Sequence, residues 1–335
     1  MAKNRETISP QIDEERVLSI AIDSLFKDKF IGSMVGTGLS DAIGEMAFHF
    51  QGKADLQARI AHADQLQYTD DTAMAIGLAV SLVQAGGLDE QHLGDTFRDG
   101  YRREPWRGYA SGPPSIFGLV QRKGMSYTEA ARTLFRGQGS FGNGAAMRIG
   151  PLGLFFYDAA DLYNKARRSA HVTHAHPIGI DGAAVLAKAI ARAVGLDPQE
   201  PFPLQNFSEE LADFARTPEM RDKVQLVHRL LAQGTTPLAA AHHLGQSVAV
   251  HESLPFALYA FLRHPTSFGE CLFCASLHGG DCDTLGAMAC SISGAYLGID
   301  AIPPDWRTKL ENQPEIEALA IQLAETRPRI GPSEL

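Results

Sequence analysis

Apolar residues recur at spacings of three and four along most of this 335-residue chain. That spacing places them on one face of a helix, and it predicts helices in the segments 17–30, 74–84, 180–194, 256–262 and 285–297. Alternating β-branched and aromatic residues, the pattern typical of strands, are scarce. With 44% apolar residues the chain can also bury a sizeable core. We therefore expect an all-α fold, built as a single compact bundle of helices.

The sequence offers no strong domain boundary. Residues 1–15 are polar and predict an N-terminal tail, which leaves one domain over residues 16–330. The segment 196–208 holds three prolines, but it is short, and we expect a loop within the domain.

The charge and hydropathy of the chain limit its partners. A formal net charge of −9 argues against broad attraction to nucleic acid or to an anionic membrane surface. The longest apolar run, 286–302, contains serines, glycines and Asp300, so it predicts a buried helix and not a membrane span. The first residues do not have the pattern of a secretory signal. We expect a cytoplasmic protein with neither a membrane nor a nucleic-acid partner.

Two distant segments place aspartate and threonine directly before an apolar helix. They are Thr69-Asp70-Asp71-Thr72 and Asp281-Cys282-Asp283-Thr284. Each could be an ordinary helix cap, because the helix dipole favours acidic residues there. Alternatively, the two segments could form one cluster of four carboxylates, which would need bound cations to offset its repulsion. Oxygen ligands suit Mg²⁺ or Mn²⁺, and two such ions could support hydrolysis. The residues alone leave both interpretations open.

The four cysteines suggest a rival, sulfur-based site. Cys271 and Cys274 have CxxC spacing, and Cys282 and Cys290 could complete a zinc site or a pair of disulfides. However, the CxxC pair and Cys290 lie within helical patterns. We expect reduced, buried cysteines with a structural role.

The segment RGQGSFGNGAAMR, residues 136–148, predicts a glycine-rich turn that leads into a helix. Such a turn can bind an anion through backbone N–H groups, although a plain turn between helices fits equally well. No GK[ST] follows, so it is not a Walker loop. Phe135 and Phe141 could stack on a base or ribose, or could pack in the core.

Three histidines follow in HVTHAHP, at His171, His174 and His176. They have no obvious carboxylate beside them, and their spacing does not place them on one face. A contact from His174 to substrate is therefore favoured over a metal site, and one or more of the three could simply be histidines whose hydrogen bonds are satisfied within the fold.

Taken together, these segments resemble the ADP-ribosylglycohydrolase family, which includes dinitrogenase-reductase-activating glycohydrolase, crystallin J1-related proteins and serine ADP-ribosylhydrolases. The matching stretches occur in the family's order between residues 30 and 298. They are FIGSMVGTGLSDAIG, YTDDTAMA, GYASGPPSIF, GQGSFGNGAAMRIGPLG, THAHPIGIDGA, ESLPFALYAFLR and GGDCDTLGAMACSISGAYLG. The TDDT and GGDxDT pair is specific, and GSFGNGAAMR is similar to the serine-type branch.

The resemblance implies the orthogonal helical bundle of that family and two bound Mg²⁺ ions, for which Mn²⁺ could substitute. The implied metal ligands are Thr69, Asp70, Asp71, Asp281, Asp283 and Thr284. The implied substrate-binding residues are Gly108, Phe135, Gly139, Ser140, Phe141, Gly142, Asn143 and His174. The implied reaction is hydrolysis of the bond between the distal ribose of ADP-ribose and an acceptor, through an oxocarbenium-like transition state.

One position departs from the family pattern. Relatives often read GDALGxxxE, and in the serine-type branch the glutamate acts at the metal site. Here Phe48 occupies its position and Ser40 replaces the first glycine. Glu45 lies three residues earlier, about one helical turn, so it could replace the missing glutamate or be a solvated surface acid. We therefore take Asp70, Asp71 and Asp283 as catalytic, with Glu45 as a fourth candidate.

These features predict a Mg²⁺-dependent hydrolase that acts on ADP-ribosylated protein or on a small ADP-ribose conjugate. A second hypothesis is a catalytically silent protein that binds ADP-ribose or has a structural role, like the crystallin-type members. A third is a toxin-immunity protein of the same fold, with the N-terminal residues as a docking arm.

Overall fold

The computed structural model describes residues 14–50 and 52–328, with side chains from residue 25 onward. Over these residues the chain forms 17 α-helices and two 3-10 helices, and no strand beyond two isolated bridges. The predicted all-α fold is confirmed. Residues 1–13 of the expected tail lie outside the described residues. No helix of the described part combines the length and the apolar character that crossing a membrane requires.

The helices follow one another with short connections. They are α1 (Glu14–Ala47), α2 (Lys53–His62), α3 (Asp70–Ala85), α4 (Glu90–Arg103), α5 (Gly112–Lys123), α6 (Tyr127–Gly137), η1 (Asn143–Ala145), α7 (Gly150–Phe155), α8 (Leu162–His171), α9 (Pro177–Val194), α10 (Leu204–Phe214), α11 (Pro218–Ala232), α12 (Pro237–Leu244), α13 (Val250–Arg263), α14 (Phe268–Ser276), α15 (Cys282–Leu297), η2 (Ile299–Ala301), α16 (Pro304–Arg307) and α17 (Gln313–Thr326). Each of the five segments with clear helical periodicity lies within one of them, in α1, α3, α9, α13 and α15.

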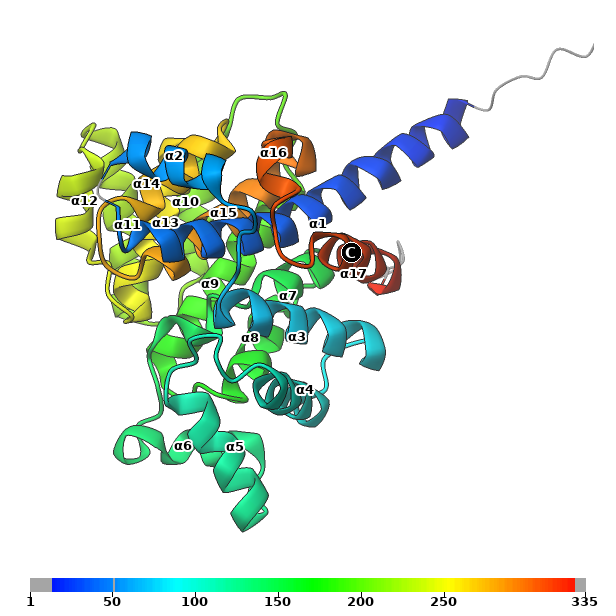
Figure 1. The fold of residues 1–335 in the computed structure, drawn as a ribbon, viewed down its shortest axis with the longest axis vertical. Coiled ribbons are helices and arrows are strands. Elements are labelled where there is room, and N and C mark those ends of the chain that lie inside the picture. The colour runs from blue at the N-terminus through cyan, green and yellow to red at the C-terminus, as the bar shows by residue number, and fades with distance from the viewer. Residues whose placement is uncertain (1–13, 51, 329–335) are drawn as a thin grey trace, which may run out of the picture.

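Two helices from opposite ends of the chain form the centre of the molecule. The long α1 packs along α15, and α3, α9, α13 and α14 surround this pair, while α5 and α6 lie together at one end (Figure 1). Helices α9 and α15 are buried over almost their whole length. This burial explains why the sequences of both helices consist mainly of apolar and small residues, since a helix covered on all sides needs no polar face.

The contact between α1 and α15 is so close that their backbones touch. A Cβ added to Gly294 would lie 2.0 Å from the carbonyl oxygen of Gly32, and one added to Gly36 would lie 2.8 Å from that of Cys290. One turn on, a Cβ on Gly286 would lie 2.7 Å from the carbonyl oxygen of Ser40. Only glycine allows an approach of this kind. The three contacts, one per turn of α1, fix the register of the two helices.

Two local predictions differ from the structure. The loop expected over 196–208 is shorter, because α10 begins at Leu204. The glycine-rich turn leads first into the three-residue helix η1, which is shorter than the helix expected there. All four cysteines are buried and unpaired, as predicted, and the CxxC pair lies within α14.

We expect Gly294→Ala to lower the free energy of unfolding by about 3 kcal/mol or more, because its methyl group would overlap the backbone of α1. Gly100→Ala is the matched control, since a Cβ at this position within α4 meets no atom within 4 Å. It should raise the free energy of unfolding by ~0.5–1 kcal/mol through helix propensity alone. Urea denaturation measures both changes, and equal effects would contradict the role of the α1–α15 contact.

Candidate active site

The first acidic segment begins α3. Thr69 is the N-cap residue of this helix, and its side chain accepts a hydrogen bond from the backbone N–H of Asp71 at 3.4 Å. The backbone N–H of Asp70 donates to the carbonyl oxygen of Arg107 at 2.7 Å. Part of this motif is therefore a helix cap, as the simpler interpretation of the sequence proposed.

The second acidic segment begins α15. Asp281 is its N-cap residue, and Asp283 accepts a hydrogen bond from the backbone N–H of Thr284 at 2.8 Å. Gly279 and Gly280 precede it with φ angles of 81° and 79°, a left-handed conformation that favours glycine. These two glycines turn the chain sharply between α14 and α15.

One turn of α1 contacts the starts of both acidic helices. The buried carboxylate of Asp41 accepts hydrogen bonds from the backbone N–H groups of Thr69 and Thr72, each at 3.0 Å, and from the Thr72 hydroxyl. Three residues later, a Cβ on Gly44 would lie 2.5 Å from the Cα atom of Asp283. Asp41 therefore anchors the start of α3, while Gly44 allows the start of α15 to lie directly against α1.

The carboxylates brought together in this way repel one another. Burial raises the pKa of Asp70 to about 7, with further contributions from the charges of Asp41 and Asp281. Burial and the charge of Asp281 raise the pKa of Asp283 to about 8. The pKa of Asp71 is raised well above its usual value by burial and by the charge of Asp283. The two motifs are thus one acidic cluster and not two independent caps.

The donor set of this cluster fits a hard divalent cation. Its side chains offer carboxylate and hydroxyl oxygens, and the buried Oδ1 atom of Asp71 has no hydrogen-bond partner. In the side-chain positions of the described residues, no group of three His, Cys, Asp or Glu converges well enough to hold a metal ion. A bound ion would therefore also need side-chain movement or oxygen atoms from threonine, water or substrate.

A cavity of about 500 Å³ opens beside the acidic cluster, a volume typical of small-molecule sites. Most of the expected site residues line it, namely Asp70, Asp71, Gly108, Phe135, Ser140, Phe141, Gly142, Asn143, His174, Asp281, Asp283 and Thr284. Three expected residues do not. Thr69 lies behind the cluster as a cap, Gly139 packs against the backbone of His176, and Glu45 is exposed outside the cavity.

The glycine-rich turn is joined to the acidic cluster. The side-chain amide of Asn143 donates to Oδ2 of Asp281 at 2.6 Å. The segment 245–249 braces both, because the carbonyl oxygen of Val248 accepts from the backbone N–H of Asn143 and that of Gln246 accepts from the backbone N–H of Asp281. The turn that could bind an anion is thereby held beside the carboxylates.

Aromatic side chains stand at the edge of the cavity. Phe135 is 62% exposed and Phe141 is 43% exposed, so neither is a core residue. Phe135 and Arg136 have φ angles of 51° and 60°, which are strained for residues with side chains. Strained backbone conformations of this kind concentrate at functional sites. Here the strained backbone at Phe135 directs its apolar ring toward solvent.

The three histidines have separate places. His174 is buried and lines the cavity, as the substrate-contact interpretation expects. His176 caps α9, accepting a hydrogen bond from the backbone N–H of Ile178. His171 ends α8. They do not form a shared metal site.

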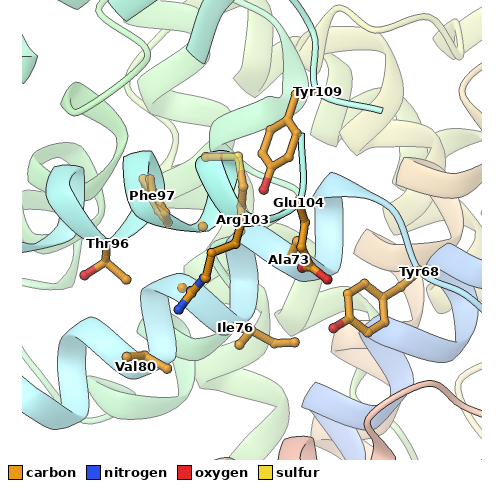
Figure 2. A pocket seen from close by; sticks show the side chains of 12 residues that line it. Tyr68, Ala73, Ile76, Val80, Thr96, Phe97, Arg103, Glu104 and Tyr109 are labelled. Carbon is orange, nitrogen blue, oxygen red and sulfur yellow. The ribbon is translucent and has the colours of Figure 1, made fainter. Parts of the chain in front are cut away.

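A second, smaller cavity of about 90 Å³ lies between α3 and α4 (Figure 2). Tyr109, Arg103 and Phe97 are among its lining side chains, and Met74 lines both cavities. Its volume suffices for only about three water molecules. It receives no residue from α15 or from the glycine-rich turn, so it is not a candidate for the active site.

A model of the ADP-ribosylglycohydrolase family matches residues 23–332. The chain belongs to the ADP-ribosylglycohydrolase family. The human protein ADP-ribosylhydrolase ARH3 is 32% identical over 338 residues, which cover 88% of this chain and 92% of that protein. The mouse protein of the same name is 32% identical over 336 residues, covering 88% and 90%. A solved structure described as an ADP-ribosylglycohydrolase-related protein complex has the same fold, with a TM-score of 0.69 at 24% identity, covering 91% of this chain and 100% of that one.

In this ADP-ribosylglycohydrolase, several site residues carry no clear signal in the sequence. Arg148, Thr173, Val248 and Ala249 line the main cavity, and Asp41 supports the cluster from behind. Asp41, Arg148 and Thr173 lie within stretches that match the family, Asp41 as the aspartate of the GDALG motif, but the stretches do not indicate which groups these side chains contact. Their roles emerge only from the packing of the helices.

The raised carboxyl pKa values predict how stability depends on pH in the metal-free protein. Between about pH 4 and pH 8 the folded cluster keeps protons that the unfolded chain releases, so the free energy of unfolding falls as the pH rises. Asp283→Asn removes one of these carboxylates and should flatten the decrease, whereas Asp64→Asn, at an exposed site, should not. Thermal unfolding in the presence of chelator, repeated across this pH range, measures how steeply the free energy of unfolding changes with pH. A stability that rises with pH, or equal slopes in both variants, would contradict the repulsive cluster.

Proposed function

We propose that this chain is a Mg²⁺-dependent hydrolase that releases ADP-ribose from a protein side chain or a small conjugate. The observation that carries this proposal is the meeting of two acidic segments and a glycine-rich turn at one cavity. Family membership and the name of the ARH3 relatives support the same class of substrate.

Two Mg²⁺ ions would be held by oxygens from Thr69, Asp70, Asp71, Asp281, Asp283 and Thr284. Bound there, the ions would offset the negative charge of the carboxylates. They would also orient ribose hydroxyl groups and lower the pKa of a water molecule. The unpartnered Oδ1 atom of Asp71 and the all-oxygen donor set support this assignment.

The chain's own residues would orient the substrate. The exposed rings of Phe135 and Phe141 offer apolar faces for a base or ribose. Within the turn, the N–H groups of Gly142 and Asn143 already donate to Ser140 Oγ and to the carbonyl oxygen of Val248, so the N–H groups of Ser140 and Phe141 would face the diphosphate. Because Asn143 is hydrogen-bonded to Asp281, substrate bound along the turn would place its distal ribose beside the acidic cluster. Positioning of this kind contributes a large share of catalysis in a two-reactant step.

The cluster would also handle the proton of the attacking water. In the metal-free protein, burial raises the pKa of Asp70 and of Asp283. Bound Mg²⁺ would offset the repulsion between the carboxylates and keep them ionised, so that a carboxylate oxygen free of metal would accept this proton. The neighbouring negative charges would stabilise the oxocarbenium-like ribose as the glycosidic bond breaks.

One observation favours the silent ADP-ribose-binding alternative. Phe48, at the position of the family glutamate, is 48% exposed and offers no charge. Glu45 is the nearest substitute, since its charge contributes to the raised pKa of Asp283. The immunity hypothesis depends on an N-terminal arm that is almost entirely outside the described residues.

Asp70→Ala and Asp283→Ala should each abolish the heat of Mg²⁺ binding in calorimetry and lower turnover by about 1000-fold, since loss of metal-based stabilisation costs several kcal/mol. Turnover is to be measured on ADP-ribosylated serine, ADP-ribosylated arginine and small ADP-ribose conjugates, with Mg²⁺ and with chelator. Asp64→Ala is the control for removing an exposed carboxylate. Unchanged Mg²⁺ binding in both site variants would refute the metal assignment, and a wild-type protein that turns over none of the conjugates would favour the silent alternative.

Glu45→Gln should lower kcat by about 100-fold if Glu45 replaces the family glutamate as an acid–base group. Glu315→Gln, at an exposed position of α17, is the matched control and should retain wild-type kcat. Full activity of the Glu45 variant would show that Glu45 is only a surface acid.

A further inference from the structure

A buried arginine, threonine and histidine form a hydrogen-bonded chain at the back of the main cavity. The Nη2 atom of Arg148 donates to Oγ1 of Thr173 at 2.7 Å, and the same oxygen lies 2.8 Å from Nδ1 of His174. All three side chains line the cavity, and their exposed fractions are 0%, 1% and 6%. Arg148 ends the glycine-rich segment, and no hydrogen bond joins the three side chains to the acidic cluster within the described residues.

The protons of this chain can be assigned by counting donors and acceptors. A guanidinium only donates, so Thr173 uses one lone pair to accept from Arg148. In the described part of the chain, the Thr173 hydroxyl has no acceptor other than His174 Nδ1. If Nδ1 carried the proton, two donors would converge on one oxygen and a buried hydroxyl hydrogen would have no partner. A buried donor without a partner is costly, so the hydroxyl donates to Nδ1.

The surroundings disfavour a charged imidazole. Burial and the nearby charge of Arg148 lower the pKa of His174 to about 3. Arg148 is itself held in place, since it donates to the carbonyl oxygen of Gly144 at 2.7 Å and its guanidinium lies 4.7 Å from the ring centre of Phe97. With Nδ1 accepting, the single ring proton of a neutral His174 must be on Nε2.

The Nε2 atom faces space that two glycines leave open. A Cβ added to Gly144 would lie 3.3 Å from Nε2, and one added to Gly142 would lie 3.8 Å from it. A side chain at position 144 would crowd the ring, whereas a Cβ at position 142 would only contact it. Because both residues are glycine, Nε2 borders the part of the cavity lined by residues 142–144.

We propose that Thr173 is a positioning residue, which holds His174 as the neutral Nε2–H tautomer so that the ring donates a hydrogen bond into the cavity. The assignment of the tautomer stands on this structure alone. The ligand that receives the hydrogen bond rests on the proposed function, and it would be an oxygen of ADP-ribose. The cavity would then hold a fixed hydrogen-bond donor on His174, together with ionised carboxylates that only accept.

The tautomer is measured directly by ¹⁵N NMR of the full chain with labelled histidine, recorded at neutral pH without ligand. The chain has 12 histidines, so His174→Gln identifies the signal by its loss. We expect one protonated nitrogen, assigned to Nε2, and one unprotonated nitrogen, assigned to Nδ1. A protonated Nδ1 with a bare Nε2, or a doubly protonated ring, would overturn the proposal.

Thr173→Val removes the hydroxyl and keeps the shape of the side chain. Both ring signals of His174 should then move toward the average of two tautomers, and Thr173→Ser should restore the wild-type spectrum. Thr37→Val is the matched control, because it also removes a buried hydroxyl, one that donates to the backbone carbonyl of Ser33 within α1 and makes no hydrogen bond to His174. An unchanged His174 spectrum in Thr173→Val would overturn the role of Thr173.

Calorimetric binding of ADP-ribose tests the consequence for the ligand. Thr173→Val should weaken binding by about 3- to 10-fold, the value of one hydrogen bond, while Thr37→Val and Thr173→Ser should bind like the wild type. Equal affinities in Thr173→Val and Thr37→Val would overturn the contribution to binding. If the wild-type protein binds no ADP-ribose, the proposed function fails, whereas the NMR result still decides the tautomer.

Discussion

The backbone contact between α1 and α15 is the constraint on which the rest of the site depends. Helices usually pack with 8–10 Å between their axes, separated by side chains. Here glycines on both helices remove that separation, and contacts that recur once per turn allow only one register. In this register, Asp41 on α1 meets the start of α3 while Gly44 meets the start of α15. The positions of the carboxylates in the acidic cluster therefore result from helix packing, and the loops only add further residues to the site.

The cluster opposes the stability of the fold that builds it. Asp70, Asp71 and Asp283 are largely buried and raise one another's pKa values, so in their ionised form they cost free energy. The surrounding structure offsets this cost with rigid support, such as the hydrogen bonds to Asp41 and from Asn143 to Asp281. A site that is repulsive when empty gains the most from a bound cation, because binding removes the repulsion and adds coordination. Functional sites commonly lower the stability of a protein in this way, and the rest of the fold compensates for the loss.

The sequence predicted most of the fold, because helical periodicity is a local signal that each segment carries by itself. It also singled out both halves of the acidic cluster, but the residues alone left open whether they are one cluster or two helix caps, and the family resemblance indicated the cluster. The roles of Asp41, Arg148 and Thr173 were not predicted, although all three lie in stretches that match the family, because Asp41 contacts Thr69 and Arg148 contacts Thr173 only once the chain is folded. The bracing segment 245–249 was missed for a similar reason, as it contributes mainly backbone carbonyl groups and these carry no sequence signature.

The two acidic segments are about 210 residues apart, from Asp71 to Asp281. Helices form quickly from local contacts, but joining segments so distant requires the closure of a very long loop. Neither segment can form the cluster alone, and α1 must already be in place between them. The binding site therefore belongs to the fully assembled domain and to no partly folded form. A ligand of this site would stabilise the molecule as a whole, slowing its global unfolding, and it could not act as a template for the early steps of folding.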